Sequence, residues 1–78
     1  MSNRQEVITF LEEMKEESGI NKRFKESANE VISLLQNNSL LAVEKAVSIL
    51  EDVGSSDISS YHRTQVWEVV SMLESNSN

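Results

Sequence analysis

Residues 7–14 read VITFLEEM, and their apolar positions indicate the class of the fold. Val7, Phe10, Leu11 and Met14 recur at spacings of three and four residues. These spacings place their side chains on one face of an α-helix, because a helix completes a turn in about 3.6 residues. The segment therefore predicts an amphipathic helix whose apolar face is covered by other parts of the chain.

The start and the end of this first helix carry their own signals. Ser2 with Gln5, and Asn3 with Glu6, form two overlapping capping-box patterns, in which the side chains bond the first free amides of a helix. Gly19 is suited to the left-handed residue that terminates a helix. We therefore expect the first helix to lie between these two signals.

Three further amphipathic blocks follow along the chain. The second helix is expected to end in the polar stretch 36–38. The third is expected to open at Ser39 and to stop at Gly54, and the fourth to run from about Ser59 to Glu74. The residues expected to form the core lie on the four apolar stripes: Leu11, Val31, Leu35, Val47, Leu50, Val66, Val70 and Leu73.

The two halves of the sequence resemble each other. Residues 7–14 align with residues 46–53, and residues 30–35 (EVISLL) align with residues 68–73 (EVVSML). Apolar matches are expected of any two amphipathic helices, whereas shared Glu and Ser at polar positions are not required by a core. The aligned pairs are Leu11 with Leu50, Glu12 with Glu51, Ile20 with Ile58, Val31 with Val69, Ser33 with Ser71 and Leu35 with Leu73.

These patterns together predict an all-α, antiparallel four-helix bundle made of two duplicated helical hairpins. Residues 1–78 are expected to form one domain, with the first hairpin at about 3–38 and the second at about 39–75. Short connections make each helix antiparallel to the one before it, so a pseudo-twofold axis is expected to relate the hairpins. Met1 and residues 75–78 are interpreted as frayed ends.

Composition favours a soluble, cytoplasmic protein. The chain has 78 residues and no cysteine, which is compatible with a reducing compartment. No apolar run approaches the roughly 20 residues that a membrane span requires, and MSNRQEV at the start has no signal-peptide core. The net charge of −6 and the pI of about 4.6 disfavour nucleic acid as a partner, because phosphate backbones are repelled.

Residues 46–75 read AVSILEDVGSSDISSYHRTQVWEVVSMLES and resemble the pattern of an archaeal family of small uncharacterised proteins, number zero-one-four-seven. Asn21 and Ser59 stand where that pattern usually has proline, and the histidine is at His62 instead of the Tyr61 position. The resemblance implies a four-helix bundle and an archaeal, cytoplasmic source, and it implies no activity. The matching positions are Arg63, Thr64, Trp67, Glu68, Leu73 and Glu74.

The sequence lacks the residue sets that catalysis or metal binding would require. His62 is the only histidine, and Ser59 stands three residues before it, where a di-iron bundle would need glutamate. Zinc would have to be held almost entirely by carboxylates, and two glycines do not make a phosphate-binding loop. We therefore expect no enzyme activity, no metal and no cofactor, with a small enzyme around His62 as the third hypothesis.

The charged residues gather where helices end and begin. Acidic residues crowd the end of the first helix (Glu12, Glu13, Glu16 and Glu17), and basic residues crowd the start of the second (Lys22, Arg23 and Lys25). In the second hairpin, Glu51 and Asp52 stand against His62 and Arg63. One interpretation is charge pairing within each hairpin, with Arg63 held by a carbonyl or by one of these carboxylates. The other is a basic site of Lys22, Arg23, Lys25 and Arg63 that binds an anion.

Trp67 is expected to be buried beside Val66 and Val70, and its alternative role is a contact with a partner. A few apolar residues lie at the margins of the stripes and are candidates for a dimer face: Ile8, Leu34, Leu41, Ile49 and Met72. The leading hypothesis is a non-enzymatic module for protein interaction or self-association. An RNA-associated accessory protein, using the basic helix starts, is the alternative. No small-molecule ligand is implied.

Overall fold

The computed structural model describes residues 3–37, 41–56 and 58–75, and within these ranges all regular structure is helical. The predicted all-α class is confirmed. The helices are α1 (Asn3–Lys15), α2 (Lys22–Asn37), α3 (Ala42–Gly54) and α4 (Ser60–Ser75).

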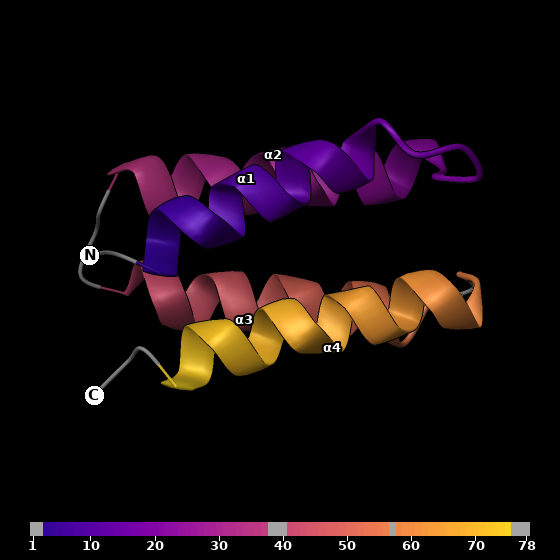
Figure 1. Ribbon diagram of the computed structural model, residues 1–78. Coiled ribbons are helices and arrows are strands. Elements are labelled where there is room, and N and C mark those ends of the chain that lie inside the picture. Colours follow the sequence, from indigo (N-terminus) through magenta and orange to yellow (C-terminus); the bar gives the residue numbers. More distant parts are fainter. Residues whose placement is uncertain (1–2, 38–40, 57, 76–78) are drawn as a thin grey trace.

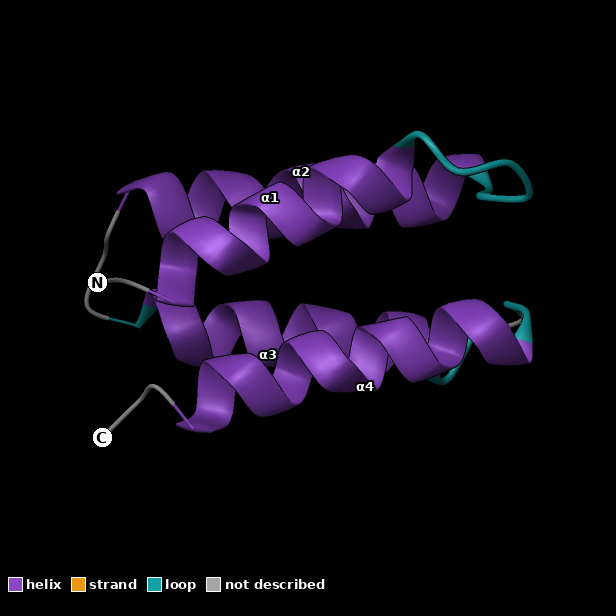
Figure 2. Ribbon diagram, in the orientation of Figure 1, coloured by secondary structure: helices purple, strands orange, loops and turns teal. Residues whose placement is uncertain are grey.

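The helices form a closed ring of neighbours. Each helix packs against the next one along the chain, and α1 also packs against α4. Figure 1 shows α1 and α4 on the near side of the bundle and α2 and α3 behind them. Figure 2 shows the loops that follow α1 and α3 at the same end of the bundle, which makes neighbouring helices antiparallel. The predicted four-helix bundle is therefore present, with overall dimensions of 32 × 19 × 18 Å.

The core runs along the inside of this ring. Seven of the eight residues predicted for it are buried, and Val47 is the exception, being only partly buried. The reason is that α3 turns Ala42, Ala46 and Leu50 inward, at a spacing of four residues. Val47 follows Ala46 by one residue, which places it beside the acidic edge between α3 and α4.

In each hairpin, one polar side chain caps the start of the second helix. The amide of Phe24 donates to Asn21 Oδ1 at 2.7 Å, and the amide of His62 donates to Ser59 Oγ at 3.2 Å. Asn21 and Ser59 are therefore N-caps, each satisfying an amide that the helix leaves free. They are the two residues that stand where the resembled pattern usually has proline.

The predicted helix boundaries are partly wrong. α1 ends at Lys15, four residues before Gly19, after which Glu16 and Glu17 make tighter turn bonds to carbonyls three residues back. α3 stops at Gly54 as predicted, but it begins at Ala42, with Leu41 preceding it and no side-chain cap. The predicted caps Ser2 and Ser39 lie outside the described residues, as do the side chain of Asn3 and residues 76–78.

The aligned positions of the two halves have matching burial. The pairs Leu11 with Leu50 and Val31 with Val69 are buried, as are Leu35 and Leu73, while Glu12, Glu51, Ser33 and Ser71 are exposed. Any two amphipathic helices that share a core would agree in the same way. The superposition of the two hairpins therefore stays a prediction.

The two glycines lead to opposite expectations. Gly19 has a φ of +88°, which costs an L-residue about 1 kcal/mol, so Gly19→Ala should lower the free energy of unfolding by about that amount. Gly54 is helical, and a Cβ there would meet Trp67 at an ordinary 3.4 Å. Gly54→Ala is thus the matched control and should be neutral or slightly stabilising. Urea unfolding followed by circular dichroism measures the stability of both variants. Equal losses of unfolding free energy would contradict the special requirement for glycine at position 19.

Candidate functional site

Two ion pairs join the acidic and basic clusters of different hairpins, which corrects the prediction that these charged side chains pair within each hairpin. Arg23 of α2 binds Asp52 of α3, with Nη2 and Oδ2 3.0 Å apart. His62 of α4 contacts Glu17, which follows α1, with Nε2 and Oε1 3.1 Å apart. The physical reason is the ring of neighbours: α2 packs on α3 and α1 on α4, so these helix ends meet across the hairpins.

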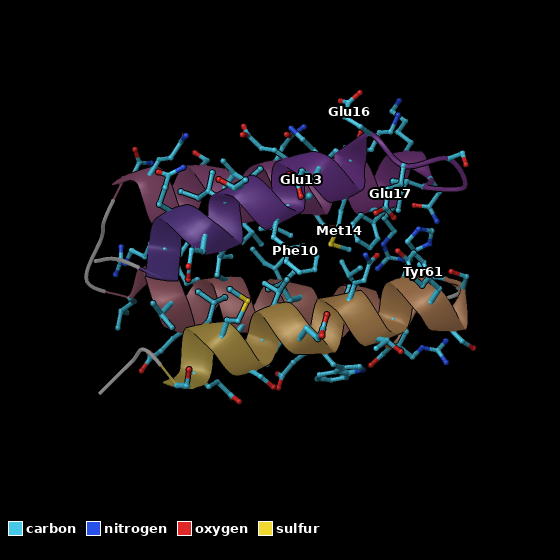
Figure 3. The ribbon with its side chains drawn as sticks, viewed as in Figure 1. Phe10, Glu13, Met14, Glu16, Glu17 and Tyr61 are labelled. Carbon is cyan, nitrogen blue, oxygen red and sulfur yellow. The ribbon has the colours of Figure 1, made fainter. Side chains whose placement is uncertain are left out.

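His62 is the centre of a polar cluster at this end of the bundle. His62 is only 7% exposed, and its Nδ1 lies 2.8 Å from Ser59 Oγ. Glu17 also accepts a bond from Gln65 at 3.5 Å, and Gln65 donates to the Tyr61 hydroxyl at 3.3 Å. Figure 3 shows Glu17 and Tyr61 at the same end of the bundle. The cluster thus joins the segment after α1 to the start of α4.

The side chains of Ser59, His62 and Glu17 form a continuous line of hydrogen-bonding contacts. Nε2 of His62 faces the Glu17 carboxylate, which can only accept a hydrogen bond, and Nδ1 faces the Ser59 hydroxyl. Ser59 Oγ already accepts the His62 amide as an N-cap. The imidazole is enclosed further by Phe24 and Tyr61, with ring centroids 6.3 and 5.3 Å away. The spacing of Ser59 and His62 is visible in the sequence, but no local pattern indicates Glu17, which is 45 positions from His62.

Arg63 binds the end of α3 through backbone carbonyls. Its Nε donates to Gly54 O at 3.1 Å, and Nη2 donates to Ser56 O at 3.4 Å and to Ile58 O at 3.5 Å. Of the predicted partners, the carbonyl group at the end of this helix is the one observed. Asp52 instead pairs with Arg23. A cation here also complements the negative end of the α3 dipole.

The remaining members of the basic cluster are exposed. The side chains of Lys22 and Lys25 make no hydrogen bond or ion pair with the part of the chain that the structure describes. Because Arg23 and Arg63 already have partners, the proposed anion site would have two free lysines at the start of α2.

Trp67 is exposed, contrary to the expectation of burial. Trp67 is 41% exposed, although part of its indole lies against Gly54. A Cβ added to Gly54 would lie 3.4 Å from Cε2 of the indole. Of the marginal apolar residues, Ile8 is buried and Leu41 is 48% exposed, while Leu34, Ile49 and Met72 are partly buried. The exposed aromatic surface of Trp67 therefore remains available for contact.

Trp67 lines a shallow groove between α1 and α4, which we call the α1–α4 groove. One half has a volume of about 500 Å³ and is lined by Phe10, Thr64, Trp67, Glu68, Ser71 and Met72. The other half has a volume of about 440 Å³ and is lined by Gln5, Glu6, Thr9, Phe10, Glu13 and Met72. Phe10 and Met72 belong to both halves, and Figure 3 shows Phe10 directed from α1 toward α4. No local pattern in the sequence indicates this groove, because its residues come from opposite ends of the chain.

Two other classes of site are absent from the described ranges. No three His, Cys, Asp or Glu side chains converge there as metal ligands would. Within the same residues, none of the helices combines the length and apolar character needed to cross a bilayer.

Comparison with known proteins identifies the family. The family model described as Uncharacterised protein family (UPF0147) matches residues 2–75. A UPF0147 protein of Methanosarcina mazei is 30% identical over 73 residues, covering 88% of this chain and 78% of the relative. A UPF0147 protein of Methanosarcina acetivorans is 29% identical over 73 residues, covering 88% and 75%. Both relatives are archaeal, and no solved structure gives a significant match. The chain therefore belongs to the uncharacterised protein family UPF0147.

Proposed function

We propose that this protein is a non-enzymatic interaction module of the cytoplasm that binds another protein through the α1–α4 groove. The observation that carries the proposal is the 41% exposure of Trp67 beside the partly buried Phe10 and Met72. Tryptophan in a concave apolar surface is typical of the residues that dominate binding energy at protein interfaces.

The polar cluster at the end of the bundle supports the non-enzymatic part of the proposal. His62 and Ser59 bond each other, and Ser59 also caps α4. Because His62 is 7% exposed and both ring nitrogens have partners, these contacts support a stabilising role for its side chain. By contrast, Trp67 is 41% exposed, although part of its indole lies against Gly54.

Protein capture with matched variants tests the proposal. Trp67→Ala removes the exposed indole, and Leu41→Ala is the control because Leu41 is a similarly exposed apolar residue outside the groove. Immobilised wild-type protein and Leu41→Ala should retain the same proteins from extracts of the source organism, and Trp67→Ala should lose them. Circular dichroism checks that each variant is folded.

Light scattering of the wild type, Trp67→Ala and Leu41→Ala tests whether the protein binds a second copy of itself. A dimer that Trp67→Ala dissociates would place a second copy in the groove. A monomeric protein whose captured partners do not depend on Trp67 would contradict the proposed function.

A further inference from the structure

The α1–α4 groove combines an apolar centre with uncompensated negative charge. Glu6 and Glu13 of α1 and Glu68 of α4 line it and are exposed, and its lining contains no Lys, Arg or His. None of these carboxylates forms an ion pair with another described residue. The groove therefore presents Phe10 and Met72 between acidic edges.

The shape of the groove suits a helix. Its lining extends along α1 from Gln5 to Glu13 and along α4 from Thr64 to Met72. At about 1.5 Å per residue each side is roughly 12 Å long, which accommodates about two turns of a third helix lying between α1 and α4. Glu6 and Glu13 are seven residues apart, so they face groups that are also about two turns apart on such a helix.

We propose that the occupant of the α1–α4 groove is a cationic amphipathic helix of a partner protein, an inference that rests on the proposed function. Apolar side chains three or four residues apart contact Phe10, Met72 and Trp67. Flanking lysines or arginines pair with Glu6, Glu13 and Glu68. The indole of Trp67 adds attraction for a cation over its face.

Charge decides against the other occupants. A second copy would bring its own Glu6, Glu13 and Glu68 to the same interface, and no basic residue lines the groove to compensate them. Nucleic acid and anionic membrane surfaces are repelled by these carboxylates and by the net charge of −6. A basic segment gains from both the carboxylates and the net charge.

Selection from a peptide library tests the charge of the occupant. The library consists of tryptophan-free amphipathic helices of about 15 residues. Their apolar stripe varies among Leu, Ile, Met and Phe, and the flanking positions vary among Lys, Gln and Glu. Selected peptides are synthesised and titrated against the whole protein, with the fluorescence of Trp67, its only tryptophan, as the signal. Lysine is expected at the flanking positions.

A charge-matched pair of variants tests the site. The variant Glu6→Gln, Glu13→Gln, Glu68→Gln should weaken binding of the selected peptides by roughly 10-fold. The control removes the same charge from three exposed carboxylates outside the groove, Glu26, Glu30 and Glu51, and should change affinity less than about 2-fold. Raising the salt concentration should weaken binding of the wild type and reduce the difference between the variants.

The outcomes separate this inference from the proposed function. Selected peptides with Gln or Glu at the flanking positions, bound in a way that needs Trp67, would overturn the cationic occupant and leave the interaction module standing. A Trp67-dependent dimer would do the same in favour of a second copy. Selection that yields no peptide dependent on the three carboxylates would also overturn the inference, while the capture experiment decides the proposed function independently.

Discussion

Leu50→Ala should lower the free energy of unfolding by roughly 2–5 kcal/mol, as truncation of a buried leucine does. Leu50 lies on the inner face of α3 and is 1% exposed. Its loss removes apolar contacts and leaves a cavity that the surrounding helices fill only in part. For a domain whose total stability is about 5 kcal/mol, a large fraction of the molecules would be unfolded at 25 °C.

Urea unfolding followed by circular dichroism measures the effect of Leu50→Ala. The matched control is Leu41→Ala, since Leu41 is 48% exposed and its truncation should change stability by less than about 0.5 kcal/mol. Equal unfolding midpoints for the two variants would show that Leu50 does not contribute to the core as described.

His62→Ala should lower the free energy of unfolding by roughly 2–4 kcal/mol. The substitution removes a buried ring that lies between Phe24 and Tyr61, and it removes the bonds to Glu17 and Ser59. Loss of side-chain volume and loss of a charge-assisted hydrogen bond each contribute, and together they account for the expected size.

Two further variants divide this effect into packing and hydrogen bonding. His62→Phe retains a ring but no hydrogen-bonding group, and Phe24 occupies the aligned position of the first hairpin. It should recover the packing part of the loss. Glu17→Gln retains an acceptor for the imidazole and should cost less than His62→Ala. Thermal unfolding of the three variants gives the comparison, and a His62→Ala protein that melts like the wild type would disprove the structural role.

The class of fold was predictable because helix periodicity is a local property. Val7, Leu11 and Met14 lie on one stripe whatever the rest of the chain does, and all three are buried. A stripe also has edges, and position along the sequence does not show how far the neighbouring helix covers them. Val47 and Trp67 lie at such edges, and both are more exposed than predicted.

The candidate site was less predictable because it depends on which helices become neighbours. The order of charged residues along the sequence located the acidic and basic clusters. The expected hairpins then suggested that the clusters pair inside each hairpin. The contact of Glu17 with His62 and of Asp52 with Arg23 follows from α1 packing on α4 and α2 packing on α3. The groove likewise requires Phe10 of α1 and Met72 of α4 to lie together, which neither local sequence indicates.

Because the four helices form a closed ring of neighbours, their packing does not depend on the order in which the chain connects them. α1 and α4 are in contact and antiparallel, so Asn3 and Ser75 lie at the same end of the bundle. A short linker could join them, and new termini could be opened between the exposed residues Ser18 and Gly19, which leaves Glu17 attached to α1 and separates no pair of packed helices. Such a circular permutant would begin at α2 and finish at α1, keep every interhelical contact, and carry α1 and α4 as consecutive helices of one hairpin.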